Sequence, residues 1–153
     1  MILRAASETD LPVVRTWFDD AATQRWLGGR DWPDESLRLR GPGRQSYVAL
    51  ADSGIVGFID CEQYEDCRAS FAIVVAPVER GRGLGRTIVE AVTALPENGG
   101  IEEFFAGIEL SNLASEKLVL AAGFVPVSDP DEDGFRYFAW WRHGRPDEVW
   151  ARP

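Results

Sequence analysis

The stretch VVAPVERGRGLGRTIVEAV, residues 74–92, decides the fold, because an apolar run ends there in glycines and arginines and an amphipathic run begins. A turn alone needs one or two glycines to reach positive φ, so the arginines require a separate explanation. A loop that leaves a strand and opens a helix presents unpaired N–H groups at the positive end of the helix dipole, where a phosphate binds. We therefore predict an anion site in this loop. Its backbone can approach the ligand at Gly81, Gly83 and Gly85, and its charged donors are Arg80, Arg82 and Arg86.

Two common phosphate loops do not fit these letters. A Walker loop, GxxxxGK[ST], placed on residues 85–87 requires glycine at Arg80 and lysine at Arg86. A dinucleotide fingerprint, GxGxxG, requires glycine at Arg86 when it starts at Gly81, and at Ile88 when it starts at Gly83. The loop therefore gives little support to ATP-dependent or hydride-transfer chemistry.

The pattern around the loop predicts a mixed α/β sheet. ASFAIVVA, residues 69–76, lacks clean alternation, which predicts a strand buried on both faces. Apolar residues at helical spacing predict a helix over 85–95, and a strand over 101–110 completes a right-handed crossover. The other expected elements are a strand at 1–6, helices at 8–20 and 21–29, a loop with a short helix at 30–44, a hairpin at 45–62, a helix at 111–124 and strands at 124–128 and 135–141.

The composition limits the possible partners. The 153 residues are 45% hydrophobic, enough for one core, and they include neither a leader-like segment nor an apolar run long enough for a membrane span. With 25 acidic residues against 16 Lys and Arg, the net charge of −9 disfavours binding to nucleic acid or to an anionic membrane and favours a cationic partner. Cys61 and Cys67 have neither redox-motif nor zinc-site spacing, so we expect two reduced thiols, no metal site and a cytoplasmic protein.

Two motifs carry a resemblance to a known family. Residues 80–85 read RxxGxG and follow the tripeptide VAP at 75–77, and NLASEKLVLAAGF occupies residues 112–124. In this combination the chain resembles the GNAT superfamily of acetyl-CoA-dependent N-acetyltransferases. Its pyrophosphate loop has the first pattern between the fourth strand and the third helix, and an Asn-x-x-Ala/Ser segment follows the next strand. The resemblance covers most of the chain, while its specific motifs lie within residues 74–124.

The resemblance implies a fold and a cofactor. We expect a single N-acetyltransferase-like domain over residues 1–153. Its α/β fold is expected to have about four helices and a mixed central sheet of about seven strands, which is splayed between the fourth and fifth strands. Acetyl-CoA is the implied cofactor. The residues implied to bind it are Val74, Val75, Arg80, Gly81, Arg82, Gly83, Leu84, Gly85, Arg86, Asn112 and Ser115. Taken alone, Asn112 reads equally well as a helix cap, and Ser115 as a small residue packed on the sheet.

The resemblance also implies where the chemistry occurs. The acetyl carbonyl is expected to meet a backbone N–H near Val75, which would stabilise the oxyanion formed as an amine attacks. Many members have a glutamate near the start of the fourth strand and a tyrosine seven residues after the asparagine, but this chain has Ser70 and Val119 there. Asp60 and Glu62, near the end of the third strand and on one face of it, are the alternative bases. An exposed strand end with no catalytic role explains this pair equally well.

The acceptor remains open at this stage among polyamines, aminoglycosides and protein N-termini. Residues 10–29, which include Trp17 and Trp26, are similar to the front of ribosomal-protein N-terminal acetyltransferases and of bacterial aminoglycoside acetyltransferases. The expected activity is acetyl transfer to a primary amine in a ternary complex, by a protein that could form a homodimer. Because of Ser70 and Val119, a non-catalytic acyl-CoA sensor or interaction module of the same fold is the alternative.

Overall fold

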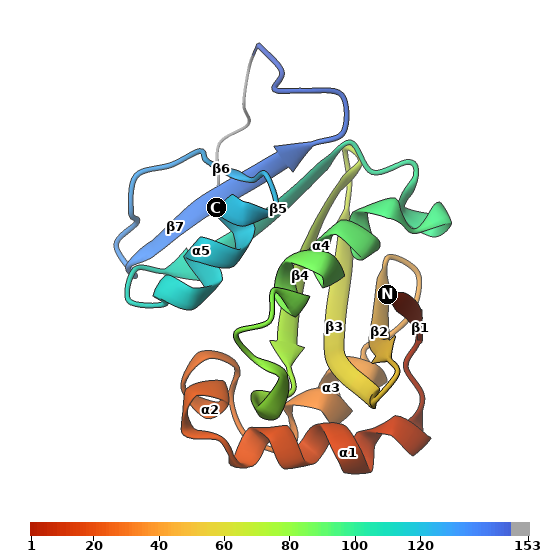
Figure 1. Cartoon of the computed structure of the whole chain (residues 1–153). Helices are drawn as coiled ribbons and strands as arrows, with labels where there is room; N and C mark the ends of the chain where they lie inside the picture. The colour runs from red at the N-terminus through yellow and green to blue at the C-terminus, as the bar shows by residue number, and fades with distance from the viewer. Residues whose placement is uncertain (148–153) are drawn as a thin grey trace.

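A seven-stranded mixed sheet organises residues 1–147, the part of the chain that this computed structural model describes (Figure 1). Its strand order is β1-β2-β3-β4-β5-β7-β6, and the only parallel pair among these strands is β4 with β5. The strands are β1 (Ile2–Ala5), β2 (Arg44–Ala51), β3 (Gly54–Tyr64), β4 (Arg68–Val75), β5 (Glu103–Glu109), β6 (Val125–Pro126) and β7 (Phe135–Trp141).

Helices cover both faces of the sheet. In Figure 1, α4 and α5 lie in front of the strands, while α1 and α3 pack against the other side. The α-helices are α1 (Leu11–Thr16), α2 (Ala21–Leu27), α3 (Trp32–Arg38), α4 (Leu84–Ala94) and α5 (Leu113–Ala121). Short 3-10 turns occupy Glu8–Asp10, Trp17–Asp19, Pro77–Glu79 and Pro96–Asn98.

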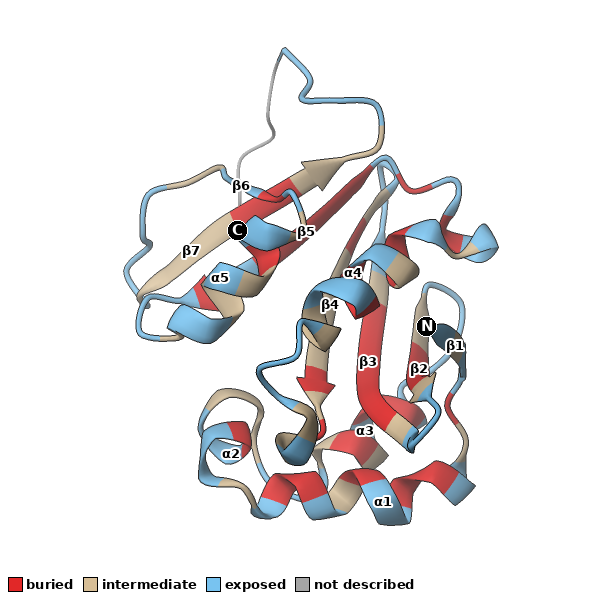
Figure 2. Cartoon of the chain, in the orientation of Figure 1, coloured by how far each residue is buried: buried red, intermediate tan, exposed pale blue. Residues whose placement is uncertain are grey.

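Strand alternation divides the apolar residues between two cores. On the side of α4 and α5, Ile59 and Phe104 pack with Val89 of α4. On the other side, Phe58 and Val48 pack with Phe18, which lies in the 3-10 turn after α1. Figure 2 shows the result: the inner strands are buried, and the outer surfaces of the helices and the loops are exposed.

The fourth and fifth strands part soon after they meet. Their parallel register covers only three pairs, from Arg68 opposite Glu103 to Ser70 opposite Phe105. Beyond Ser70, β4 continues to Val75 without β5 beside it, and Figure 1 shows the two strands diverging towards the viewer's lower edge. The expected splay of the sheet is therefore confirmed.

Most of the expected elements are confirmed, with differences in detail. The region 8–20 is α1 with a 3-10 turn at each end, because Pro12 and the capping box of Ser7 and Asp10 set its first turn. Residues 1–147 contain five α-helices where about four were expected, and α3 is the short helix expected within residues 30–44. The strand expected at 124–128 pairs only at Val125 and Pro126. Among the described residues, no helix is both long and apolar enough to cross a membrane.

Candidate active site

The glycine loop enters α4 through two left-handed residues. Gly81 has φ +79° and Gly83, the N-cap of α4, has φ +75°. A side chain at either position would meet open space, so glycine is required there by backbone conformation and not by crowding. The first turn of α4 therefore presents N–H groups with no side-chain cap, the arrangement that binds a phosphate.

Gly85 has a different reason to be glycine. A Cβ at this position would lie 2.2 Å from Cδ1 and 3.1 Å from Cγ of Leu118, a residue of α5. The first turn of α4 thus approaches α5 closely because Gly85 has no side chain. The third glycine of the motif fixes how two helices pack beside the loop.

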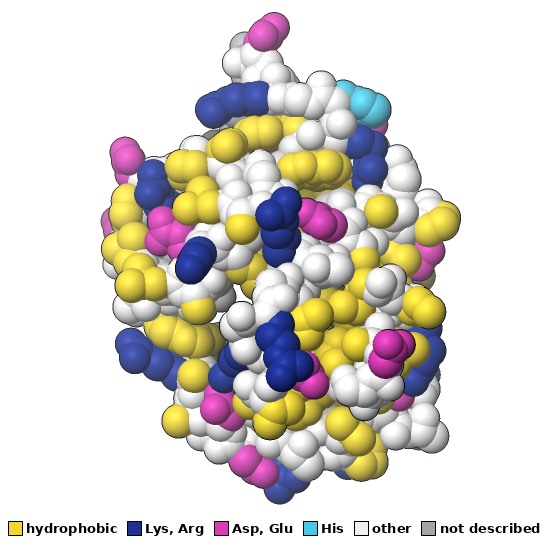
Figure 3. Space-filling view, viewed as in Figure 1, with side chains coloured by type: hydrophobic (Ala, Val, Ile, Leu, Met, Phe, Trp, Pro, Cys, Tyr) yellow, Lys and Arg dark blue, Asp and Glu magenta, His cyan; other side chains and the backbone are white. Residues whose placement is uncertain are grey.

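Each arginine of the loop is paired with an acidic side chain. Arg80 donates from Nη1 to Oδ2 of Asp20 at 2.9 Å. Arg82 and Arg86 pair within their own segment, with Glu79 at 3.0 Å and Glu90 at 2.9 Å. In Figure 3, which views the face of α4 and α5, basic and acidic side chains are interspersed among hydrophobic ones. The predicted arginines lie at the loop, and their side chains are held by carboxylates of this chain.

The backbone of β4 offers free donors on the side where β5 parts from it after Ser70, and we call this region between the two strands the cleft. The N–H of Ala76 bonds the carbonyl of Val56 at 2.9 Å, so in this antiparallel register the pairs Val75–Gly57 and Ile73–Ile59 are not hydrogen-bonded to each other. The N–H groups of Ile73 and Val75 therefore point away from β3. They face the side from which β5 has diverged.

The walls of this cleft are apolar and only partly buried. Ile73 and Val75 of β4, Leu84 of α4 and Leu118 of α5 pack against the core without being enclosed. Val74, in contrast, is 4% exposed and packs in the core beside α1, so only its backbone can take part in the predicted cofactor contact. The cleft combines an apolar wall with free backbone N–H groups.

The segment that begins at Asn112 starts helix α5. Asn112 is the N-cap of α5 and its side chain accepts a hydrogen bond from the N–H of Ser115 at 3.3 Å. Ser115 is half-buried in the first turn. Val119 is 3% exposed and packs in the core, so no polar side chain faces the cleft from that position.

The two predicted bases lie on the same face of β3, opposite to α4, but their surroundings differ. Asp60 is 8% exposed and accepts both Nε at 3.2 Å and Nη2 at 2.6 Å from Arg44. Glu62 has a side chain that is 41% exposed, and its nearest Arg44 nitrogen is 3.8 Å away. Both oxygens of Asp60 are engaged by Arg44 in a nearly buried ion pair, whereas Glu62 is more exposed and remains available to a ligand.

Residues from four strands surround Glu62. The hydroxyl of Tyr64 donates to Oε2 of Glu62 at 3.1 Å, and Oγ of Ser70 lies 3.5 Å from the same hydroxyl. Tyr64 also packs on Phe105, with ring centroids 5.5 Å apart. We call the surface formed by Glu62, Tyr64, Ser70, Phe105 and Tyr137 the open face, because all of these side chains except Phe105 are exposed or only partly buried.

Three of the five residues of the open face, Tyr64, Phe105 and Tyr137, were not predicted from the sequence. Tyr137 of β7 lies over Gly107 of β5, where a Cβ would be 2.9 Å from Cε1 of the tyrosine ring, and burial raises the pKa of Tyr137. The sequence also did not predict that Arg44 pairs with Asp60 or that Tyr64 bonds to Glu62. These residues are brought together by strand register, which no local motif in the sequence records.

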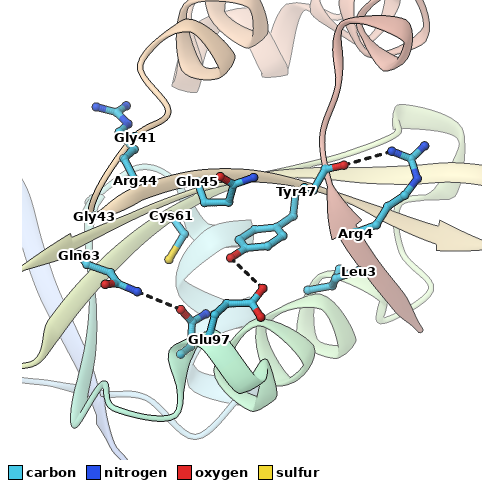
Figure 4. A pocket seen from close by; sticks show the side chains of 12 residues that line it. Leu3, Arg4, Gly41, Gly43, Arg44, Gln45, Tyr47, Cys61, Gln63 and Glu97 are labelled. Carbon is cyan, nitrogen blue, oxygen red and sulfur yellow. Dashed lines mark hydrogen bonds between the residues drawn. The ribbon is translucent and has the colours of Figure 1, made fainter.

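A separate hollow of about 360 Å³ lies on the opposite face of the sheet, between β1, β2 and the turn Pro96–Asn98 (Figure 4). Tyr47 donates to Glu97 at 3.3 Å and Gln63 to Asn98 at 3.3 Å, so its polar groups satisfy one another. Burial raises the pKa of Cys61 in its wall to about 12, which keeps that thiol protonated and unreactive. The hollow contains none of the predicted site residues.

The cysteines and acidic groups give no sign of a metal centre. Cys61 and Cys67 are both free thiols, the first buried and the second exposed. Within residues 1–147, no three His, Cys, Asp or Glu side chains come together in a way that could hold a metal ion.

Comparison with known proteins bears out the family. Residues 11–124 match the model of the acetyltransferase (GNAT) family. An N-acetyltransferase of Bacillus subtilis, YfmK, whose function is uncharacterised, is 30% identical over 131 residues, which cover 84% of this chain and 88% of YfmK.

Solved structures share the fold at low sequence identity. An aminoglycoside acetyltransferase in complex with coenzyme A superposes with a TM-score of 0.76 at 19% identity, covering 92% of this chain and 94% of the other. A spermidine N-acetyltransferase of Vibrio cholerae, in complex with CoA and spermine, gives a TM-score of 0.77 at 16% identity, covering 93% and 95%. The chain therefore belongs to the acetyltransferase (GNAT) family: it is an N-acetyltransferase, and acetyl-CoA is its acetyl donor.

Proposed function

We propose that this enzyme transfers the acetyl group to a primary amine by direct attack in a ternary complex, with the donor bound between β4 and β5. The observation that carries the proposal is the splay after Ser70, which leaves the N–H groups of Ile73 and Val75 facing the gap below the glycine loop. A diphosphate at the first turn of α4 would place the pantetheine arm along this edge of β4. Its amides could then extend the sheet, as an added strand does.

The free N–H groups of β4 supply the electrophilic part of the reaction. When an amine attacks the thioester carbonyl, negative charge develops on its oxygen, and the N–H of Val75 or of Ile73 is positioned to stabilise it. A fixed donor of this kind lowers the barrier by about 3 kcal/mol in other acyl-transfer enzymes. Holding both reactants in the cleft supplies much of the remaining rate.

Glu62 is the group best placed to remove the proton from an ammonium acceptor. It lies directly opposite Ser70 in the β3–β4 register, at a Cα separation of about 5.5 Å for such a pair, and Ser70 occupies the position where many relatives have glutamate. In this chain the carboxylate that many relatives have on β4 would therefore be supplied by the neighbouring strand, β3. Tyr64 fixes its orientation through the 3.1 Å hydrogen bond, and a water can relay the proton.

The departing thiolate receives no proton from α5 in this proposal. Val119 is buried and apolar at the position where relatives have tyrosine. A thiolate is a tolerable leaving group, and a water in the cleft can return the proton to it. The chemistry therefore depends on one carboxylate and one backbone donor, without a dedicated acid.

A cationic acceptor fits the charge of the protein. The net charge of −9 attracts ammonium groups, and the open face contributes the carboxylate of Glu62 and the hydroxyls of Tyr64 and Tyr137. Two proteins of similar fold have been solved with such amines, an aminoglycoside acetyltransferase with kanamycin and a spermidine N-acetyltransferase with spermine. We infer a cationic small-molecule amine as the acceptor, with a peptide N-terminus as the competing class.

Thiol release from acetyl-CoA, measured with spermine, kanamycin and a short peptide, tests this function. We expect amine-dependent release with at least one cationic small molecule. Stabilisation by CoA on heating without any amine-dependent release would instead support the acyl-CoA sensor. Stabilisation by ATP or NAD and not by CoA would contradict both.

A further inference from the structure

Arg80 differs from the other arginines of the glycine loop in the origin of its partners. Its Nη1 donates to Oδ2 of Asp20 at 2.9 Å and its Nη2 to Oγ1 of Thr23 at 2.6 Å. Both acceptors come from the first turn of α2, almost sixty residues earlier in the chain, whereas Arg82 and Arg86 pair with neighbours three and four residues away. Arg80 is therefore the loop arginine that α2 holds.

The acceptors of Arg80 are themselves fixed. Asp20 caps α2 by accepting the N–H of Thr23 at 3.0 Å, and its same oxygen accepts the Thr23 hydroxyl at 3.0 Å. Thr23 is only 3% exposed. Arg80, together with the Thr23 N–H, lowers the pKa of Asp20, so the carboxylate stays charged across the neutral range. A guanidinium bonded to this pair has one orientation instead of many.

This hold leaves most of the guanidinium free. An arginine has five N–H donors in a planar fork, and Asp20 and Thr23 use two of them. Three donors remain for a second anion, and the side chain of Arg80 is 39% exposed. An arginine with its rotamer already fixed loses less freedom when it binds that anion.

We propose that Asp20 and Thr23 are positioning residues, which orient Arg80 for the diphosphate of the cofactor and so connect α2 to cofactor binding. The inference rests on the proposed use of the glycine loop, and it goes beyond it by giving α2 a part in the cofactor site. The arrangement also gives the short α2 a fixed attachment to the loop.

The sign of the effect separates positioning from simple electrostatics. Asp20 is an anion close to the site of another anion, so its charge alone opposes the binding of a diphosphate. Loss of that charge would strengthen cofactor binding if Asp20 merely competed for Arg80. If Asp20 positions Arg80, the same substitution weakens binding.

Calorimetric titration of CoA into the wild type and the variants Asp20→Asn and Thr23→Val tests the proposal. Asparagine remains a good N-cap, and valine has the shape of threonine without a charge change, so α2 is expected to stay folded. We expect CoA to bind each variant about tenfold more weakly than the wild type, as loss of one charged hydrogen-bond network predicts. Glu79→Gln is the matched control, since it removes the same charge from the partner of Arg82, and we expect it to bind CoA no more weakly than the wild type.

A second readout distinguishes positioning from general damage. Acetyl-pantetheine lacks the diphosphate, so the variants are expected to lose kcat/KM with acetyl-CoA and to keep the wild-type value with acetyl-pantetheine. An Arg80→Gln background should abolish the effect of Asp20→Asn. Tighter CoA binding by Asp20→Asn, equal loss with both donors, or unchanged binding in both variants would overturn the proposal. Failure of the wild type itself to bind CoA would overturn the proposed function instead.

Discussion

The cofactor cleft and the open face lie on the two sides of the same diverging strands, yet they are assembled in different ways. Most of the cleft is built from a continuous stretch, β4 followed by the glycine loop and the start of α4, to which α5 adds Leu118. The open face combines side chains of β3, β4, β5 and β7. A site made from one stretch leaves a motif in the sequence, whereas a site made by strand register does not.

Removing the carboxylate of Glu62 should have the largest effect and should separate the role of the open face from that of the cleft. For Glu62→Gln we expect kcat to fall about 100-fold, or about 2.7 kcal/mol, because general-base catalysis contributes at least this much. KM for acetyl-CoA should stay unchanged, since the proposed cofactor site lies on the other side of the strands. Steady-state kinetics at saturating amine measures both quantities.

Asp60→Asn is the matched control on the same face of β3. This substitution replaces one of the two oxygens that accept from Arg44 by an amide group and removes the negative charge, and we expect about 2 kcal/mol less unfolding free energy in urea with a smaller loss of kcat. Glu62→Gln should change stability by less than about 0.5 kcal/mol, because its ion pair is exposed. A folded Asp60→Asn enzyme with the lower kcat of the two would reverse the assignment of the base.

The cleft side is tested by crowding the contact between α4 and α5. For Gly85→Ala we expect about 1–2 kcal/mol of destabilisation, because the new methyl would overlap the side chain of Leu118. Since alanine otherwise favours a helix by about 1 kcal/mol, the sign of the measured change in thermal unfolding is informative. In a Leu118→Ala background the overlapping side chain is absent, so Gly85→Ala should cost clearly less stability there. An equal cost in both backgrounds would contradict a packing role for Gly85.

The smallest expected effect is a pH dependence of stability far from both sites. Asp10 is 4% exposed, and Arg4 together with the N–H of Ser7 lowers its pKa. Because the folded pKa lies below the unfolded one, the contribution is present above the unfolded pKa and is lost as the pH falls through the folded value. We expect Asp10→Asn to cost about 1 kcal/mol at pH 7 and clearly less at pH 3, measured by urea unfolding. An equal cost at both pH values would show that the charge of Asp10 does not stabilise the fold.

How far the sequence predicts the structure follows from the same contrast. Periodicity and turn residues place most elements, and RxxGxG with the segment from Asn112 indicates the family. The splay of the sheet was predicted from the resemblance to the family and not from periodicity. The partners of the arginines could not be predicted, because Asp20 meets Arg80 only after α2 folds against the loop. For the same reason the sequence could not predict that Asp60 is held in an ion pair while Glu62 is more exposed. This difference depends on Arg44 and Tyr64, which come from other positions in the sheet.

Amide hydrogen exchange, measured by NMR with and without acetyl-CoA, tests the central claim that the donor lies along β4 in the splay. In the free protein we predict that the N–H groups of Ile73 and Val75 exchange faster than that of Val74, which pairs with β3. Saturating acetyl-CoA should slow the exchange of Ile73 and Val75 by about tenfold or more, together with amides in the first turn of α4. Unchanged exchange at Ile73 and Val75, or protection only around Tyr47 in the separate hollow, would contradict the account.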